Sequence, residues 1–243
     1  MKRTMTITAA DGRCPVGLFS TGPGKGPKPG VILYMDAFGP RPGLDVMAER
    51  LAGEGYVVLV PDLFYRQGAY GPFDAKTAFT QEDTRNALRG IMAATPQEMT
   101  RRDTAYFLDV LAGEAGGRVG AVGYCMGGAR ALTAAGAYPD QVFAAASLHG
   151  GNLASDAPDS PHLLAPQMKG RIYVGVAGVD NSFPPEQSAR LALALREAEV
   201  DHLIENYVGK LHGWCVPDHG VYDEAGAERH WKRLLTLFDE TLR

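Results

Sequence analysis

One short stretch, residues 118–130 (RVGAVGYCMGGAR), constrains the fold of this chain more than any other. Apolar and small residues lead into the motif GYCMGG at 123–128, and a helix rich in small residues is expected to follow. The pattern is typical of a buried strand, a sharp turn and a helix, with the thiol of Cys125 at the apex. Glycines on both sides leave room for a strained backbone and for close packing of strand against helix. We therefore predict a nucleophile at Cys125.

The rest of the chain alternates between strand patterns and helix patterns. Continuous apolar runs such as VILYM at 31–35 and YVVLV at 56–60 are typical of strands buried on both faces of a parallel sheet. Further strands are expected at residues 5–8, 16–20, 118–124, 143–148, 171–176 and 202–208, and helices at residues 42–54, 84–93, 100–111, 126–138, 185–198 and 223–242. No repeat and no change of composition divides the chain. We therefore predict one doubly wound α/β domain over residues 1–243, with a mostly parallel central sheet flanked by helices on both faces.

Three connecting segments carry less regular patterns. Residues 21–30 (TGPGKGPKPG) are dense in glycine and proline, and they favour a surface connection over an interdomain linker because a strand follows at once. Residues 64–80 are aromatic and glycine-rich, which favours a loop with a short helical piece and leaves open whether it forms a lid. Residues 152–166 are polar and proline-rich and are expected to form a surface loop.

Composition disfavours several classes of partner. The formal net charge of −4 argues against a nucleic-acid or an anionic-membrane surface, and no apolar run reaches the roughly 20 residues that span a bilayer. The N-terminal residues have the pattern of a first strand and not that of a signal peptide. Cys14, Cys125 and Cys215 are an odd number without C-x-x-C spacing, which disfavours a disulfide framework and a zinc site. We expect a cytoplasmic protein without cofactor or metal, acting as a monomer or a small homo-oligomer on a small molecule.

Four chemically active side chains each follow a separate expected strand, namely Asp36, Cys125, Asp180 and His212. Ligands of doubly wound folds bind outside the carboxyl ends of the strands, so these side chains are expected to converge there. Cys125 needs its thiolate form to attack a carbonyl group, and both the start of a helix and a nearby histidine favour an anion. The alternative is that Cys125 is a small buried hydrophobic residue, as free cysteines often are.

His212 is the best candidate for the base among six histidines. It lies in a glycine-flanked loop after the last expected strand, and it completes the order nucleophile, acid, histidine along the chain. His149 follows the strand after the nucleophile and is a further candidate for the wall of the site.

Asp180 is the best candidate for the acid, because it follows the strand between the elbow and His212. A carboxylate in this position orients the imidazole and stabilises its charged form. Asp156, Asp159 and Asp201 lie near the same strand and remain alternatives. The structural alternative for Asp180 itself is an Asx turn.

Two backbone amides are expected to form an oxyanion hole. One belongs to Met126, the residue after the nucleophile, and the other to the loop after the strand at 31–35, where Ala37 is the best candidate. A carboxylate beside such a hole is costly without a role, so Asp36 is either a functional residue or a turn cap. The aromatic side chains expected to line an apolar pocket near the site are Phe38, Tyr65 and Trp214.

Four motifs in this order resemble the dienelactone hydrolase family, the cysteine branch of the α/β-hydrolases. They are DAFG at 36–39, GYCMGG at 123–128, GVD at 178–180 and HGW at 212–214. The resemblance covers essentially the whole chain, and the combination is specific although each motif alone is weak. It implies an α/β-hydrolase fold with a catalytic triad and an oxyanion hole. The residues concerned are Cys125, His212 and Asp180 for the triad, and Met126 and Ala37 for the hole.

The resemblance also implies a role for Asp36. Family members often carry glutamate at this position, where the carboxylate interacts with the nucleophilic thiol and helps to form the thiolate when substrate binds. The dienelactone enzyme of the family has an arginine shortly after its catalytic histidine, whereas residues 212–220 (HGWCVPDHG) contain none. The resemblance therefore implies the hydrolase chemistry without identifying the substrate.

Together these residues predict hydrolysis of a lactone or an activated ester through a thioester acyl-enzyme. A thiolate is itself a good leaving group, so the tetrahedral intermediate returns to substrate unless the other leaving group is also good. Enol-lactones, aryl esters and thioesters are therefore expected to react better than alkyl esters and amides. Two alternatives remain open. One is a hydrolase of another carbonyl substrate, such as a thioester or a carbamate, and the other is a redox sensor or ligand-binding protein whose Cys125 reacts without turnover.

Overall fold

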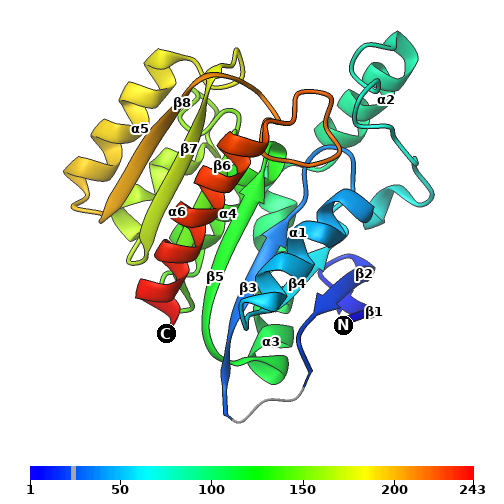
Figure 1. The fold of residues 1–243 in the computed structure, drawn as a ribbon, viewed down its shortest axis with the longest axis vertical. Helices are drawn as coiled ribbons and strands as arrows, with labels where there is room; N and C mark the ends of the chain where they lie inside the picture. Colours follow the sequence, from blue (N-terminus) through cyan, green and yellow to red (C-terminus); the bar gives the residue numbers. More distant parts are fainter. Residues whose placement is uncertain (23–25) are drawn as a thin grey trace.

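The computed structural model describes residues 1–22 and 26–243 (Figure 1). The strands are β1 (Lys2–Ala9), β2 (Gly12–Phe19), β3 (Lys28–Tyr34), β4 (Val57–Pro61), β5 (Gly116–Tyr124), β6 (Val142–Leu148), β7 (Arg171–Val179) and β8 (His202–Leu211). The helices are α1 (Pro42–Gly53), α2 (Glu82–Ala93), α3 (Gln97–Glu114), α4 (Met126–Ala137), α5 (Pro185–Glu197) and α6 (Glu224–Leu242), with 3₁₀ helices η1 (Tyr65–Gln67) and η2 (Pro161–Gln167). The connection expected at 21–30 includes residues 23–25, which lie outside the described residues.

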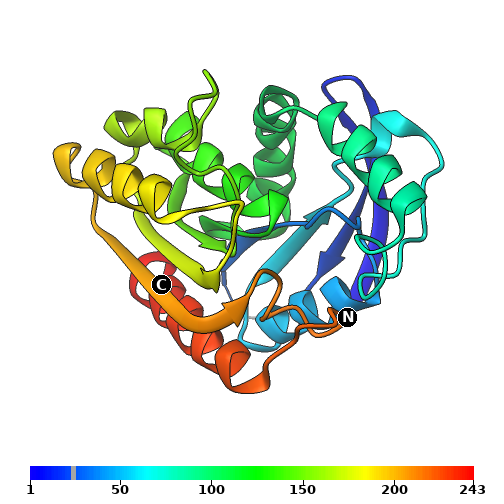
Figure 2. The same cartoon turned by 90° about the horizontal axis from the view of Figure 1, so that it is seen from above.

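The strands form one sheet in the order β1-β2-β4-β3-β5-β6-β7-β8. The pairs β1–β2 and β2–β4 are antiparallel, and the pairs from β4–β3 to β7–β8 are parallel. Helices α1 and α6 cover one face of this sheet, and α3, α4 and α5 cover the other (Figure 2). The predicted α/β class, with a mostly parallel sheet between two layers of helices, is confirmed.

The buried strands carry the apolar runs that the sequence places there. Residues 30–34 of β3 and every residue of β4 are buried. A strand covered by helices on both faces needs apolar side chains on both, whereas β1 at the edge of the sheet is mostly exposed. Helix α6 buries Trp231 and Phe238, and Asp223 caps its N-terminus by accepting the N–H of Gly226 at 2.7 Å.

Several element boundaries differ from the sequence prediction, among them those of α3 and β8. Helix α3 begins at Gln97, because Pro96 takes the extended conformation before its first turn. Strand β8 continues to Leu211, because its pairing with β7 resumes beyond Gly209 as far as the Val179–Leu211 pair. Helix η2 lies largely within the segment expected to be a loop. None of the helices in the described ranges has the length and apolar character needed to cross a membrane.

Candidate active site

Cys125 occupies a strained turn between β5 and α4. Its φ is +55°, in the left-handed region that non-glycine residues rarely adopt. A Cβ atom at Gly123 would overlap the carbonyl group of Gly127, and a Cβ atom at Gly127 would overlap the carbonyl group of Tyr34. The two glycines therefore let α4 begin directly against β3 and β5. The thiol consequently stands at the carboxyl edge of the sheet, at the N-terminus of a helix.

Asp180 and His212 lie at the ends of the paired strands β7 and β8 and form a close pair. Oδ2 of Asp180 lies 2.6 Å from Nδ1 of His212. Oδ1 accepts hydrogen bonds from the backbone N–H and the hydroxyl of Ser182 at 2.8 and 2.6 Å. The two oxygens of Asp180 thus make an Asx turn and a contact with the imidazole at the same time. Asp180 can therefore form an Asx turn and orient the imidazole together, although the sequence offered these roles as alternatives.

The surroundings of His212 favour its charged form. Burial opposes the charge, but the charge and hydrogen bonding of Cys125 and of Asp180 raise the pKa of His212 to about 10. Burial raises the pKa of Asp180, yet the hydrogen bond and charge of His212 outweigh it and leave this pKa below its usual value. The imidazole remains 31% exposed, whereas the Asp180 side chain is only 4% exposed. His212 can therefore exchange protons with a molecule in the adjacent cavity.

A cavity of about 740 Å³ opens in front of these three residues. Its apolar wall includes Phe79, Met92, Ala93 and Pro96 from the α2 region, and its polar wall includes Asn152, Ser155, Asp159 and Ser160. Cys125, Met126, Asp180 and His212 line the same space. This size suits a small organic substrate.

The predicted oxyanion amides follow the ends of two adjacent strands, β3 and β5. Tyr34 of β3 pairs with Gly123 of β5, so Ala37 and Met126 each follow this pair by three residues. In the described part of the chain, neither backbone N–H donates a hydrogen bond. Two such free donors beside the thiol can stabilise an oxyanion.

Asp36 is fully buried, but its carboxylate contacts Arg41 and His219. Its two oxygens accept hydrogen bonds from Arg41 at 2.7 and 2.9 Å, and Oδ2 lies 3.1 Å from Nε2 of His219. Burial raises the pKa of Asp36, but these two partners lower it below its usual value. No hydrogen bond joins this carboxylate to Cys125 in the described ranges. The hydrogen-bond partners of this carboxylate are instead Arg41, His219 and the backbone N–H of Phe38.

Arg41 continues this contact to a second carboxylate. Its Nε and Nη2 donate to Asp218 at 2.7 and 2.9 Å. Asp218 and His219 belong to the loop that begins at His212. Asp36, Arg41, Asp218 and His219 therefore join the loop after β3 to the loop after β8.

The three aromatic residues expected at the pocket lie elsewhere. Trp214 is fully buried under the site and stacks on Tyr207, with ring centroids 4.5 Å apart. Phe38 packs against Phe79 and lines a second cavity of about 490 Å³ beside β2. Phe38 thus lies behind the apolar wall, because Phe79 from the segment expected to be a loop or lid stands in front of it.

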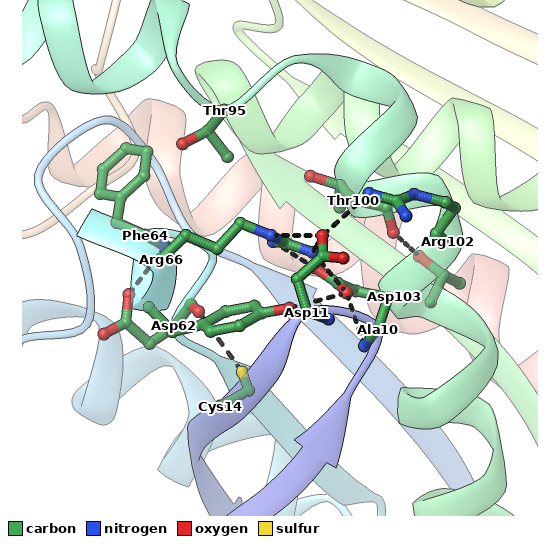
Figure 3. Close-up of polar contacts among 12 residues, drawn as sticks. Ala10, Asp11, Cys14, Asp62, Phe64, Arg66, Thr95, Thr100, Arg102 and Asp103 are labelled. Atoms are coloured by element: carbon green, nitrogen blue, oxygen red, sulfur yellow. Dashed lines mark hydrogen bonds and ion pairs between the residues drawn. The ribbon is translucent and has the colours of Figure 1, made fainter. Parts of the chain in front are cut away.

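Tyr65 lies in a polar cluster at the β1–β2 turn. Its hydroxyl donates to Asp103 at 3.0 Å. Arg66 pairs with Asp103 at 2.7 Å and with Asp11, and these contacts fix η1 to α3 (Figure 3). Tyr65 therefore belongs to a structural cluster and not to the cavity that contains Cys125.

Two polar residues at the site carried no motif in the sequence. Ser182 places its hydroxyl 3.3 Å from Nδ1 of His212, and its position after Asp180 was the available signal. Arg130 lines the cavity and donates to the carbonyl of Thr95 at 2.6 Å and to the side chain of Gln97. Its Nε has no hydrogen-bond partner among the described residues, and burial lowers its pKa to about 10.

His149 is a further residue at the site, and sequence reasoning placed it only as a candidate for the wall. Its Nδ1 accepts the backbone N–H of Cys125 at 3.1 Å. Its ring contacts the ring of His212, with centroids 4.8 Å apart. As to metals, no group of three or more potential side-chain ligands occurs in the described ranges.

Comparison with known proteins gives a consistent picture. The model of the family described as "Dienelactone hydrolase family" matches residues 17–242. An Escherichia coli protein named "Putative carboxymethylenebutenolidase" is 28% identical over 220 residues, covering 88% of this chain and 78% of that protein. A Klebsiella pneumoniae structure described as a "Putative Dienelactone Hydrolase" has a TM-score of 0.87 at 23% identity, covering 98% of each chain. A dienelactone hydrolase-like promiscuous phosphotriesterase from metagenomic libraries has a TM-score of 0.82 at 25% identity, covering 100% of this chain and 99% of that one.

Proposed function

This chain belongs to the dienelactone hydrolase family, and we propose that it hydrolyses a lactone or an activated ester through Cys125, His212 and Asp180. The observation that carries the proposal is the convergence of these side chains on one cavity. The 2.6 Å pair of Asp180 and His212 supports it, because an oriented imidazolium next to a thiol favours the thiolate.

In acylation, the Cys125 thiolate attacks the carbonyl carbon of the substrate and forms a tetrahedral intermediate. The amides of Ala37 and Met126 stabilise the negative charge on the former carbonyl oxygen. His212 then protonates the departing alcohol or enol oxygen as the carbon–oxygen bond breaks. The product of this half-reaction is a thioester on Cys125.

In deacylation, neutral His212 takes a proton from a water molecule, which attacks the thioester carbonyl. Collapse of the second tetrahedral intermediate releases the carboxylic acid and regenerates the thiolate–imidazolium pair. Asp180 holds the Nδ1–H of His212 throughout both half-reactions. Substrates with good leaving groups should react best, since the thiolate competes with the other leaving group in acylation.

The position of Arg130 favours a substrate that carries an anionic group. Among the described residues its side chain donates only to neutral acceptors, and Asp159 on the same cavity acts on its charge without an ion pair. A buried cation without a paired carboxylate is costly. We expect Arg130→Gln to raise KM about tenfold or more for an aryl ester with a carboxylate, and to leave KM for the matched neutral ester unchanged. Equal effects on both esters would remove this part of the proposal.

The proposal extends to the setting of the enzyme. We propose a single catalytic domain over residues 1–243, acting in the cytoplasm on a small molecule without a cofactor. The three cysteines, Cys14, Cys125 and Cys215, are all free thiols in the structure, which supports a reducing compartment.

Turnover of an aryl ester by matched cysteine variants tests the proposal. Cys125→Ala should reduce hydrolysis to the uncatalysed rate, because no nucleophile remains. Cys14→Ala is the control, since Cys14 is buried on β2 and burial raises the pKa of its thiol to about 12. The proposal would be wrong if both variants retained turnover.

A further inference from the structure

His149 lies directly behind both members of the proposed nucleophile–base pair. It follows β6, and its backbone N–H donates to the carbonyl of Gly175 in β7 at 2.8 Å. Its φ is +39°, which is uncommon for a residue with a side chain. The side chain is fixed beneath the elbow, because the residue is only 1% exposed.

The contact with Cys125 determines the protonation state of His149. The amide of Cys125 can only donate a hydrogen bond, so Nδ1 of His149 must carry a lone pair. The ring is therefore the neutral tautomer with its proton on Nε2. Burial lowers the pKa of His149 well below its usual value, and the nearby His212, His219 and His230 lower it further.

The same ring also contacts His212 and Trp214. The His149 ring meets the His212 ring edge-on at 4.8 Å and the Trp214 ring at 5.3 Å. A second cation at this distance from a protonated His212 would be repelled, so the neutral state of His149 suits both neighbours. Nε2 of His149 has no hydrogen-bond partner among the described residues.

We propose that His149 is a positioning residue for the reaction: its neutral imidazole holds the amide of Cys125 through Nδ1. The inference rests on the proposed function for its chemical meaning. The hydrogen bond helps to maintain the strained backbone at Cys125, where Leu148 supplies a second acceptor at 3.1 Å.

Two substitutions separate the hydrogen bond from mere packing. His149→Asn keeps an acceptor near the position of Nδ1 and loses most of the ring, whereas His149→Phe keeps the ring and loses the acceptor. We expect the rate constant for alkylation of Cys125 by iodoacetamide to stay within about threefold of wild type in the asparagine variant. It should fall about tenfold in the phenylalanine variant, which corresponds to the loss of one hydrogen bond. A packing role predicts the opposite order and would overturn the proposal.

Wild-type protein offers a second measurement that does not depend on how the variants fold. Two-bond ¹H–¹⁵N correlation spectra of ¹⁵N-histidine-labelled protein at neutral pH should show His149 as the neutral Nε2–H tautomer. A proton on Nδ1, or a charged ring, would contradict the proposal. Alkylation and tautomer need no ester turnover. Ester turnover by Cys125→Ala and Cys14→Ala therefore tests the proposed function. The order of the alkylation rates of the two His149 variants tests this inference.

Discussion

Two carboxylate–imidazole pairs lie at this end of the sheet, and they have different neighbours. Asp180 and His212 are joined at 2.6 Å, and Asp36 and His219 at 3.1 Å. All four residues come from loops at the carboxyl edge of the sheet. The first pair opens to the cavity and to Cys125, whereas Arg41 closes the second pair and both of its side chains are less than one-tenth exposed.

The difference shows that a pair's surroundings, and not its residue types, determine what it can do. The carboxylate of Asp180 has no competing cation among its hydrogen-bond partners in the described part of the chain, and the charge of Cys125 and the hydrogen bond to Asp180 together raise the pKa of His212 to about 10. Asp36 is shared between His219 and Arg41, and Arg41 also pairs with Asp218, so this pair holds two loops together. We therefore assign proton transfer to the open pair and loop positioning to the closed one.

The largest expected effect is on catalysis at the open pair. Asp180→Asn should lower kcat for an aryl ester by about 10³-fold or more, because His212 loses its orientation and its stabilised charge. The free energy of unfolding should change little, since the asparagine can still accept hydrogen bonds from Ser182. Steady-state kinetics and urea denaturation on one preparation measure both. If Asp180→Asn lost unfolding free energy as well as kcat, the distinction between the two pairs would be removed.

The closed pair should respond in the reverse manner. Asp36→Asn leaves Arg41 buried with one carboxylate fewer, and should lower the free energy of unfolding by about 3 kcal/mol. The pH profile of Cys125 alkylation should stay unchanged in the folded variant, because no hydrogen bond joins Asp36 to the thiol among the described residues. A displaced profile would restore the thiol-modulating role that family resemblance implies.

Gly213 connects the two pairs and provides a smaller test. Its φ is +99°, and a Cβ atom there would overlap Nδ1 of His219. Gly213→Ala should therefore cost about 1–3 kcal/mol in unfolding free energy and also lower kcat, since His212 is the adjacent residue. Gly53→Ala at the end of α1 is the matched control, because a Cβ atom there meets no neighbour. Equal melting temperatures for the two variants would contradict this account.

The smallest expected effect is a displacement along the pH axis. His212 must be protonated to release the leaving group, so kcat/KM should fall as pH rises through about 10. Asp180 contributes to the raised pKa of His212, so this fall should occur at lower pH in Asp180→Asn. Rates measured from pH 6 to 11 with a neutral aryl ester provide the check. A wild-type fall near pH 6.5 would mean that His212 is not held in its charged form.

Much of the fold was predictable from the apolar runs of the strands, and much of the site was predictable because its residues follow strand ends. Apolar runs of strand length indicated the buried strands, and glycines marked the elbow at Cys125. A parallel sheet collects the carboxyl ends of its strands, so Asp180 and His212 could be placed near the thiol without coordinates. The Asx turn made by Asp180 was also visible in the sequence, but only as an alternative to its contact with the imidazole.

The parts that sequence reasoning placed wrongly depend on the direction of side chains within loops. Trp214 follows His212 by two residues, but stacking on Tyr207 turns it under the site. Tyr65 hydrogen-bonds to Asp103, which is distant in sequence. Arg41 lies five residues after Asp36, and sequence reasoning overlooked it as a partner of that carboxylate. His149 gave no signal beyond its strand end, because its role comes from a tautomer that packing selects.

The central claim is that Cys125 forms a covalent acyl-enzyme. Wild type and Cys125→Ala are mixed with an aryl ester, stopped in acid within the first turnover, digested and analysed by mass spectrometry. The account predicts one acyl group on the peptide that contains Cys125 in wild type, and no acylated peptide in the variant. Equal acylation of both proteins, or wild-type turnover without an adduct on Cys125 even when deacylation is slowed, would contradict it.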